Sequence, residues 1–170
     1  FYPLASYPEA FAISIITVGS GFIFHELAHR FAAQYYGYWA EFRLWTYGLL
    51  LAIVLTLISW GRFVFAAPGA VYIVPTWTAA IDYQEIRKRS GLVSVIGPLV
   101  NLGLAALFYG IRLMGPPFAE VGWRGMWVNT ALAAFNMLPL GILDGKKVFD
   151  WNPVICATVT IPAWIVVLFY

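Results

Sequence analysis

Long apolar runs alternate with short charged clusters along almost the whole chain. Six hydrophobic segments lie between the charges: Ala10–Phe24, Leu44–Gly61, Phe63–Ile81, Ser90–Ile111, Gly125–Leu143 and Trp151–Tyr170. Each approaches or reaches the ~20 apolar residues that a helix needs to cross the hydrocarbon core of a bilayer. The pattern therefore predicts an all-α polytopic membrane protein with about six hydrophobic segments, and residues 1–170 are expected to form a single domain.

The third segment contains a stretch that favours a strand. Residues 70–74 (Ala-Val-Tyr-Ile-Val) are rich in β-favouring side chains, and Pro68, Gly69 and Pro75 border them. Extended backbone is tolerated at membrane depth only where protein covers it or where it lines a cavity. We therefore predict a short membrane-embedded strand region near residues 63–74, with a proline-kinked helix as the alternative.

Composition confirms the apolar class and excludes others. Hydrophobic residues make up 62% of the 170 and charged residues 11%, against about 45–50% and about 25% in ordinary globular domains. A single cysteine excludes a disulfide scaffold. A net charge of +2, with no basic stripe, gives no surface for nucleic acid. We expect the lipid bilayer as a partner, and neither nucleic acid nor a nucleotide.

Basic residues give an orientation, because Lys and Arg are enriched in cytoplasmic loops. The basic groups are Arg87-Lys88-Arg89, Arg30 with Arg43, and Lys146 with Lys147. Placing all of them on one side makes segments 44–61 and 63–81 one hairpin and segments 90–111 and 125–143 another. Arg112, Glu120 and Arg124 then lie outside. We predict a multi-pass protein of the cell membrane, with the end of its first helix towards the cytosol.

The chain has two histidines, and they lie four residues apart in His25-Glu26-Leu27-Ala28-His29. On a helix, positions i and i+4 share one face. Two imidazoles so placed can bind one Zn²⁺ while the glutamate reaches a water on the metal. A polar helix end at the membrane surface is the alternative, although a charge inside an apolar segment indicates a functional site. We predict one zinc ion per chain, with Glu26 as the catalytic general base.

A catalytic zinc has three protein ligands and a water, so one more ligand is needed. Asp144 is the natural candidate, because it follows an apolar run just past Leu138-Pro139-Leu140-Gly141, where the helix should break. A solvated turn is the alternative for Asp144. The remaining acids are expected in loops or interfaces as solvated charges: Glu9, Glu41, Asp82, Glu85, Glu120 and Asp150.

Three motifs, in order, resemble the signatures of the site-2 proteases. They are Phe24-His25-Glu26-Leu27-Ala28-His29, then Gly97-Pro98-Leu99-Val100-Asn101, then Phe135-Asn136-Met137-Leu138-Pro139 leading to Leu143-Asp144-Gly145. That family comprises zinc metalloproteases that cut membrane-anchored regulatory proteins within the membrane. The resemblance covers roughly residues 10–150. It implies a helical membrane core with a few short strands near the site, His25, His29 and Asp144 as zinc ligands, and Glu26 as the catalytic glutamate.

The resemblance also implies a substrate, the transmembrane segment of a membrane-anchored protein. Asn136, eight residues before Asp144, falls where the family has a polar residue that assists substrate or transition-state binding. Gly69, Ala70 and Val71 fall in the family's strand region, which could pair with an unwound substrate. Asn101 is a candidate for substrate contact or for a hydrogen bond between helices. The chain departs from the family in Gly145-Lys146-Lys147, where a second glycine often stands, and in Leu44–Gly61, which looks like an insertion.

The sequence thus predicts an intramembrane zinc metalloendopeptidase, and two alternatives remain. A prenyl-protein type membrane metalloprotease would use a glutamate as its third ligand, which the Leu-Asp-Gly setting of Asp144 does not favour. A non-catalytic zinc-binding membrane protein, such as a transporter, would more often spread polar ligands along a path, and it would have no need of Glu26.

Overall fold

The computed structural model describes residues 7–44, 69–75 and 82–169, together with residues 46–48, 50, 54 and 58. The described chain is mostly helical. It forms two compact units, which comprise residues 1–29 with 80–170 and residues 30–79. Helix α2 (Ser20–Tyr35) is continuous from the first unit into the second.

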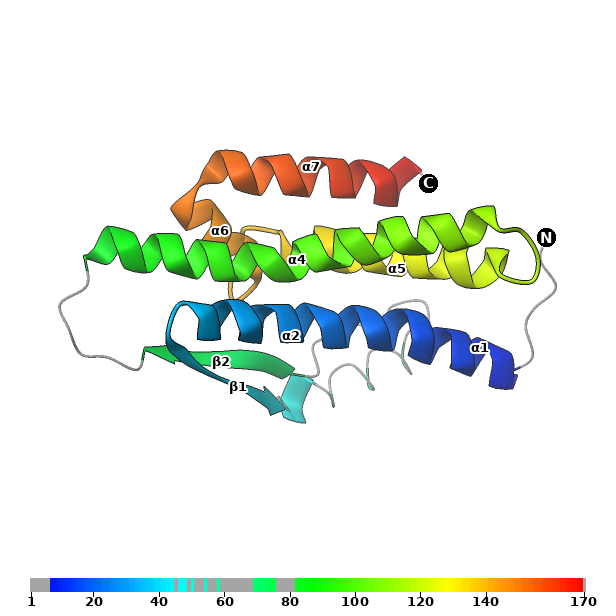
Figure 1. Ribbon diagram of the computed structural model, residues 1–170, viewed down its shortest axis with the longest axis horizontal. Coiled ribbons are helices and arrows are strands. Elements are labelled where there is room, and N and C mark those ends of the chain that lie inside the picture. Colours follow the sequence, from blue (N-terminus) through cyan, green and yellow to red (C-terminus); the bar gives the residue numbers. More distant parts are fainter. Residues whose placement is uncertain are drawn as a thin grey trace. The chain divides into compact units, whose positions relative to one another are not determined.

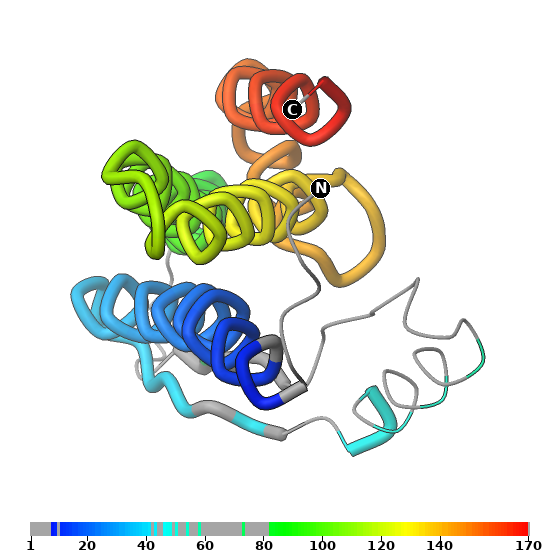
Figure 2. The backbone as a smooth tube through the Cα atoms, turned by 90° about the vertical axis from the view of Figure 1, so that its right-hand side faces the viewer, coloured from blue at the N-terminus to red at the C-terminus, as the bar shows by residue number. Residues whose placement is uncertain are grey.

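The first unit is a set of packed helices. They are α1 (Tyr7–Ser14), the π-helical η1 (Ile15–Gly19), α2 as far as His29, α4 (Tyr83–Leu113), α5 (Ala119–Asn136), α6 (Asp144–Trp151) and α7 (Pro153–Phe169). Helix α4 packs along α5 and against α6, and α5 packs against η1 and α7. Within this unit, α4 and α5 form a middle layer between α1–α2 and α7 (Figures 1 and 2).

The interior of this unit contains polar as well as apolar side chains, and many large apolar side chains face outward. The buried polar residues are Thr17, His25, His29, Ser94, Asn101, Asn129 and Thr130. The exposed apolar residues include Ile23 and Phe24 on α2, Leu99 and Leu107 on α4, and Val154, Ile161, Ile165 and Leu168 on α7. The same interior contains two apolar clusters, which are Val95 with Met137, Val148 and Cys156, and Ala105 with Phe108 and Met126.

Two described helices are long and apolar enough to cross a membrane: Phe11–Tyr35 and Tyr83–Leu113. The apolar helix α7 is shorter. The predicted helical class is therefore confirmed. Six membrane spans are not confirmed, because only two of the described helices are long and apolar enough to cross a membrane. Segments 44–61 and 63–81 lie largely outside the described residues.

The six acids that were expected as solvated charges in loops or interfaces all belong to a helix, its N-cap or a strand. Glu9 lies in α1, Glu41 in the strand Tyr38–Leu44 and Asp150 in α6, while Asp82, Glu85 and Glu120 lie at the starts of α4 and α5. Asp82 is the N-cap of α4, where its Oδ1 accepts the Gln84 N–H at 3.3 Å. Glu85 pairs with Arg89 at 2.8 Å and Glu120 with Arg124 at 2.7 Å, both at i,i+4 spacing. Such pairs allow a helix to extend through charged residues, so α4 and α5 begin before the apolar runs that indicated them.

The second unit contains an antiparallel pair of strands, β1 (Tyr38–Leu44) and β2 (Gly69–Pro75). The register pairs Tyr38 with Pro75 and Leu44 with Gly69. The predicted strand region is thus confirmed for residues 69–74, and residues 63–68 lie outside the described chain. The all-α expectation is corrected by β1, whose aromatic residues Tyr38, Trp39 and Phe42 favour a strand.

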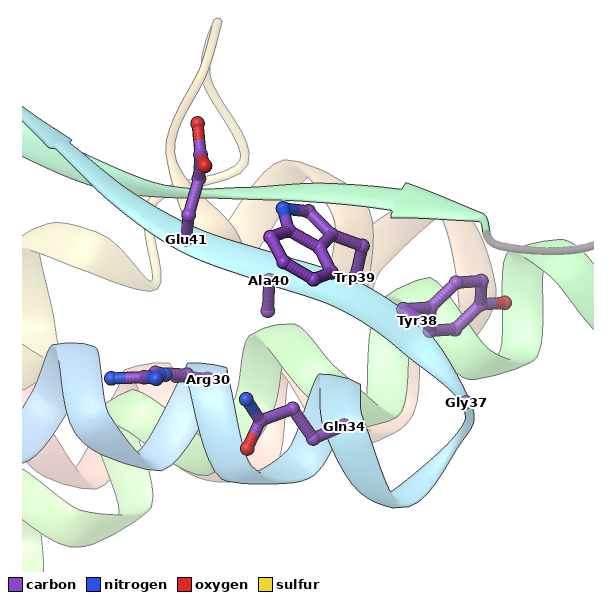
Figure 3. A pocket seen from close by; sticks show the side chains of 7 residues that line it. All are labelled: Arg30, Gln34, Gly37, Tyr38, Trp39, Ala40 and Glu41. Atoms are coloured by element: carbon purple, nitrogen blue, oxygen red, sulfur yellow. The ribbon is translucent and has the colours of Figure 1, made fainter.

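A turn after α2 leads directly into β1. Gly37 has φ 75°, the left-handed conformation that ends many helices and that favours glycine. A cavity of ≈ 680 Å³ lies between the end of α2, which contributes Arg30 and Gln34, and residues 37–41 (Figure 3). Of the predicted site residues whose side chains the structure describes, none lines this cavity.

Candidate metal centre

Helix α2 presents both histidines on one face, as the i,i+4 spacing predicts. His25 and His29 are buried, with 5% and 6% of their surfaces exposed. Their Nε2 atoms lie 2.9 Å apart, and the two rings meet edge to face. The two imidazole nitrogens therefore point to a common centre.

Asp144 reaches the same centre from a different part of the chain. Helix α5 ends at Asn136 and α6 begins at Asp144, so the helix break expected at Leu138–Gly141 is confirmed. The Asp144 Oδ2 lies 3.2 Å from His25 Nε2 and 3.0 Å from His29 Nε2. The structure thus brings together three residues that span 119 positions of sequence.

The spacing of the three donor atoms fits a tetrahedral zinc ion. Two ligand atoms, each about 2.0–2.1 Å from such an ion, lie about 3.3 Å apart. The observed separations are 2.9, 3.0 and 3.2 Å. Two nitrogens and one carboxylate oxygen also match the donor set of catalytic zinc sites, which leave a fourth position open.

Hydrogen bonds on the far side of each imidazole set its tautomer. His25 Nδ1 donates to Asn101 Oδ1 at 2.5 Å, and His29 Nδ1 donates to the Val93 carbonyl at 2.8 Å. Because both partners are acceptors, each Nδ1 holds the proton and each Nε2 is free to direct a lone pair at the centre. Metal-binding histidines characteristically donate their second ring N–H in this way.

The third donor is anionic. Burial by itself would raise the pKa of the Asp144 carboxyl, but His29 and His25 beside it outweigh burial and hold the pKa well below its ordinary value. A carboxylate oxygen and two imidazole nitrogens in contact are stable only with a cation between them, which is a proton or a metal ion. The residues present therefore fit a zinc ion.

The other predicted site residues lie in different places. Glu26 is half-buried on α2, one position after His25, and close enough to His29 for its charge to act there. Asn101 lies behind His25 as its hydrogen-bond partner. Asn136 donates from Nδ2 to the Leu132 carbonyl at 3.0 Å, within α5. Gly69, Ala70 and Val71 lie on β2, in the second unit.

Gly97 is a further residue that the centre requires, and we had used it only as part of a motif. A Cβ at Gly97 would lie 2.7 Å from His25 Nε2 and still closer to His29 Nε2. Real Cβ atoms essentially never approach other atoms so closely. Helix α4 can therefore approach the two imidazoles only because residue 97 has no side chain.

Replacing Gly97 by alanine is expected to prevent zinc binding, because the new methyl group would occupy the space where the Nε2 lone pairs converge. Gly103→Ala on the same helix is a matched control, since its Cβ would meet nothing within 4 Å. Zinc content of the purified variants, measured by atomic emission, tests this. Full zinc occupancy in Gly97→Ala would show that the imidazoles converge differently.

Gly145 has a comparable role beside Asp144. A Cβ there would overlap the carbonyl groups of Met137 and Leu138. The chain after α5 can therefore turn back against α6 only when residue 145 is glycine. This close packing fixes the end of α6 from which Asp144 projects.

Known proteins resemble this chain over most of its length. “Putative zinc metalloprotease MJ0611” of Methanocaldococcus jannaschii is 44% identical over 164 residues, which cover 92% of this chain and 81% of that protein. YwhC of Bacillus subtilis, with the same form of name, is 26% identical, over 88% of this chain and 71% of that protein. Rip2 of Mycobacterium tuberculosis is 29% identical, over 84% and 60%.

No family model matches the chain, and no solved structure matches it. The match to the archaeal relative nevertheless extends across both units of the structure. It agrees with the resemblance that the three motifs indicated, and the histidines and aspartate of those motifs converge on one centre. The chain belongs to the site-2 protease family of zinc metalloproteases.

Proposed function

We propose that the protein is an intramembrane zinc metalloprotease that hydrolyses peptide bonds in transmembrane segments of membrane-anchored regulatory proteins. The observation that carries this proposal is the convergence of His25, His29 and Asp144, with Glu26 beside them. The relatives, whose names class them as zinc metalloproteases, support the metalloprotease chemistry. We propose one zinc ion per chain, because the described residues contain one such cluster.

The distribution of side chains supports a site inside the membrane. Outward-facing Ile23, Phe24, Ile161 and Ile165 would be covered by lipid tails. The buried Asn101, Asn129 and Thr130 resemble the polar residues that hold transmembrane helices together. Glycines allow the same helices to pack closely: Gly91 lies against Trp151 and Gly125 against Phe108. The protein core proposed here comprises residues 1–170.

The residues of the site would divide the chemistry between them. His25, His29 and Asp144 would hold the zinc ion, which when bound acidifies a water and polarises the scissile carbonyl. Glu26 would accept the proton of the attacking water and return it to the leaving amine. A helical peptide bond is shielded and its carbonyl is already hydrogen-bonded, so the substrate must unwind before hydrolysis.

We propose two substrate-binding elements. The described residues pair β2 with β1 alone, so an extended substrate segment could add to the sheet at Gly69, Ala70 and Val71. Asn136, eight residues before Asp144, retains a carbonyl oxygen and a second N–H with which to bind substrate backbone. Asn101 is fully buried, so we assign it to the support of His25 and no longer to substrate contact.

The alternative functions fit the site less well. A prenyl-protein type metalloprotease would place a glutamate as third ligand, whereas the carboxylate in contact with both histidines is Asp144. A transporter or other non-catalytic zinc protein would have no use for a general base beside the ligands. The role of Glu26 therefore distinguishes a zinc enzyme from a protein that only binds zinc. The test is cleavage of a single-span model substrate by zinc-loaded purified protein, with the Glu26→Gln protein as the inactive control.

We also propose that the start of α4 faces the cytosol of a cell membrane, because Arg87-Lys88-Arg89 lies there. Position 88 and position 121 lie near the starts of α4 and α5, which are joined by a turn at the far end of α4. Single cysteines at these two positions should react with a membrane-impermeant reagent from opposite sides, in a background without Cys156. Reaction from one side only would contradict the proposed hairpin.

A further inference from the structure

Behind the metal centre lies a chain of hydrogen bonds that links three helical segments. Asn101 on α4 accepts a hydrogen bond from His25, and it donates from Nδ2 to Asn129 Oδ1 and to the Gly21 carbonyl, both at 3.0 Å. Asn129 on α5 donates in turn to the carbonyls of Gly125, at 2.9 Å, and Thr17, at 3.4 Å. Asn101 and Asn129 are completely buried.

The direction of this chain is fixed by its far end. The carbonyls of Thr17 and Gly125 can only accept, so the NH₂ group of Asn129 must face them and its Oδ1 must face Asn101. Asn101 must then turn its NH₂ group towards Asn129 and Gly21, which leaves Oδ1 towards His25. A flip of either amide would bring NH₂ groups and carbonyl oxygens against their own kind in a buried site.

We infer that the Asn129–Asn101 pair is a positioning device that holds His25 in the Nδ1–H tautomer before any metal arrives. Because Asn101 offers His25 only an acceptor, the imidazole must hold its proton on Nδ1 and present the bare Nε2 to the centre. His29 reaches the same state through the Val93 backbone carbonyl, which no substitution of Val93 removes. The tautomer of His25 therefore depends on side chains, whereas that of His29 depends on the main chain.

The hydrogen-bonded asparagines also require close packing of the helices around them. A Cβ at Gly21 would lie 2.6 Å from Asn129 Oδ1, so α2 approaches the asparagine pair only through glycine. Thr17 lies in η1, where π-helical hydrogen bonding replaces the regular ladder, a feature frequent at functional sites. The continuous segment η1–α2 thus supplies the ligand His25. It also supplies the Gly21 carbonyl, which orients Asn101, and the Thr17 carbonyl, which orients Asn129.

The inference gives different roles to the two ends of the Asn101 amide: Oδ1 accepts from His25, and Nδ2 holds the amide in place. Two variants of Asn101 distinguish these roles. Asn101→Leu removes the acceptor and both donors. Asn101→Asp keeps an acceptor for His25 but removes the donors to Asn129 and Gly21. If Asn101 only held helices together, both variants would suffer alike. If it positions His25, Asn101→Leu should weaken zinc binding by about 10–100-fold. Asn101→Asp, which keeps the acceptor for His25, should weaken it less.

A second measurement examines the protein without metal. The chain has two histidines, so ¹⁵N-histidine labelling gives two imidazoles whose protonated nitrogens NMR can identify. In the wild type both imidazoles should carry a proton on Nδ1. In Asn101→Leu, His25 should shift towards Nε2–H while His29 keeps its state, which also reports that the helices remain folded.

The outcomes are distinct. Equal losses of zinc affinity in Asn101→Leu and Asn101→Asp, or a wild-type His25 without a proton on Nδ1, would overturn the inference. The inference rests on zinc binding as proposed above, but the tautomer is measured in its absence. Wild-type protein that binds no zinc would therefore overturn the proposed function, whereas the tautomer result alone decides the role of Asn101.

Discussion

Replacing Glu26 by glutamine is expected to abolish proteolysis while zinc binding and fold remain intact. Glutamine nearly matches glutamate in shape and can still hydrogen-bond a water, but it cannot accept the proton. Loss of general-base assistance typically removes about 10²–10⁴ of rate. Glu26 is half-buried, and the hydrogen bonds of His25 to Asn101 and of His29 to the Val93 carbonyl do not involve it, so both remain when its charge is removed. The measurement is cleavage of a model transmembrane substrate at equal zinc content.

Glu120→Gln provides the matched control for this experiment. Glu120 forms an i,i+4 ion pair with Arg124 on α5, and it has no described contact with the three ligands. The same chemical change there should leave cleavage at the wild-type rate, because partly exposed pairs contribute little. Undiminished cleavage by zinc-loaded Glu26→Gln protein would rule out Glu26 as the general base.

Replacing Asp144 by alanine is expected to remove zinc from the protein. The Asp144 carboxylate is the one group that joins α6 to both imidazoles, and its loss leaves two neutral ligands with no anionic charge to balance the ion. Affinity should fall by more than the ~10–100-fold that loss of a supporting hydrogen bond costs. Zinc per chain after gel filtration, and competition with a chelator, measure this loss.

Asp150→Ala is the control for this second variant. Asp150 belongs to the same helix and is paired with Lys146 on an exposed face, at 2.5 Å. Its removal should leave zinc stoichiometry unchanged. If the Asp144→Ala protein retained one zinc per chain with wild-type affinity, Asp144 would not be the third ligand, although His25 and His29 could still be.

Much of the helical architecture was predictable from the sequence. A long apolar run indicates a helix buried in lipid or protein, whichever segments pack against it. Runs 90–111 and 151–170 became the cores of α4 and α7. Helix ends were predicted less well. Asp82, Glu85 and Glu120 looked like loop residues, yet capping and i,i+4 pairing place them in the first turns of helices or next to them. A charged residue lowers the hydrophobicity of a segment equally whether it is paired in the first turn of a helix or solvated in a loop, so hydrophobicity alone does not distinguish the two.

The sequence by itself determined the two histidines as a pair, because i,i+4 spacing on a helix requires no tertiary information. It also indicated Asp144, through its place after a helix break. Only the tertiary structure decided that the Asp144 carboxylate lies 3.0 Å from His29, that Gly97 must lack a side chain, and that Asn101 orients His25. These contacts join residues that lie from 68 positions (His29 and Gly97) to 115 positions (His29 and Asp144) apart. Such distances are set by how the helices pack, and no local pattern of the chain encodes them.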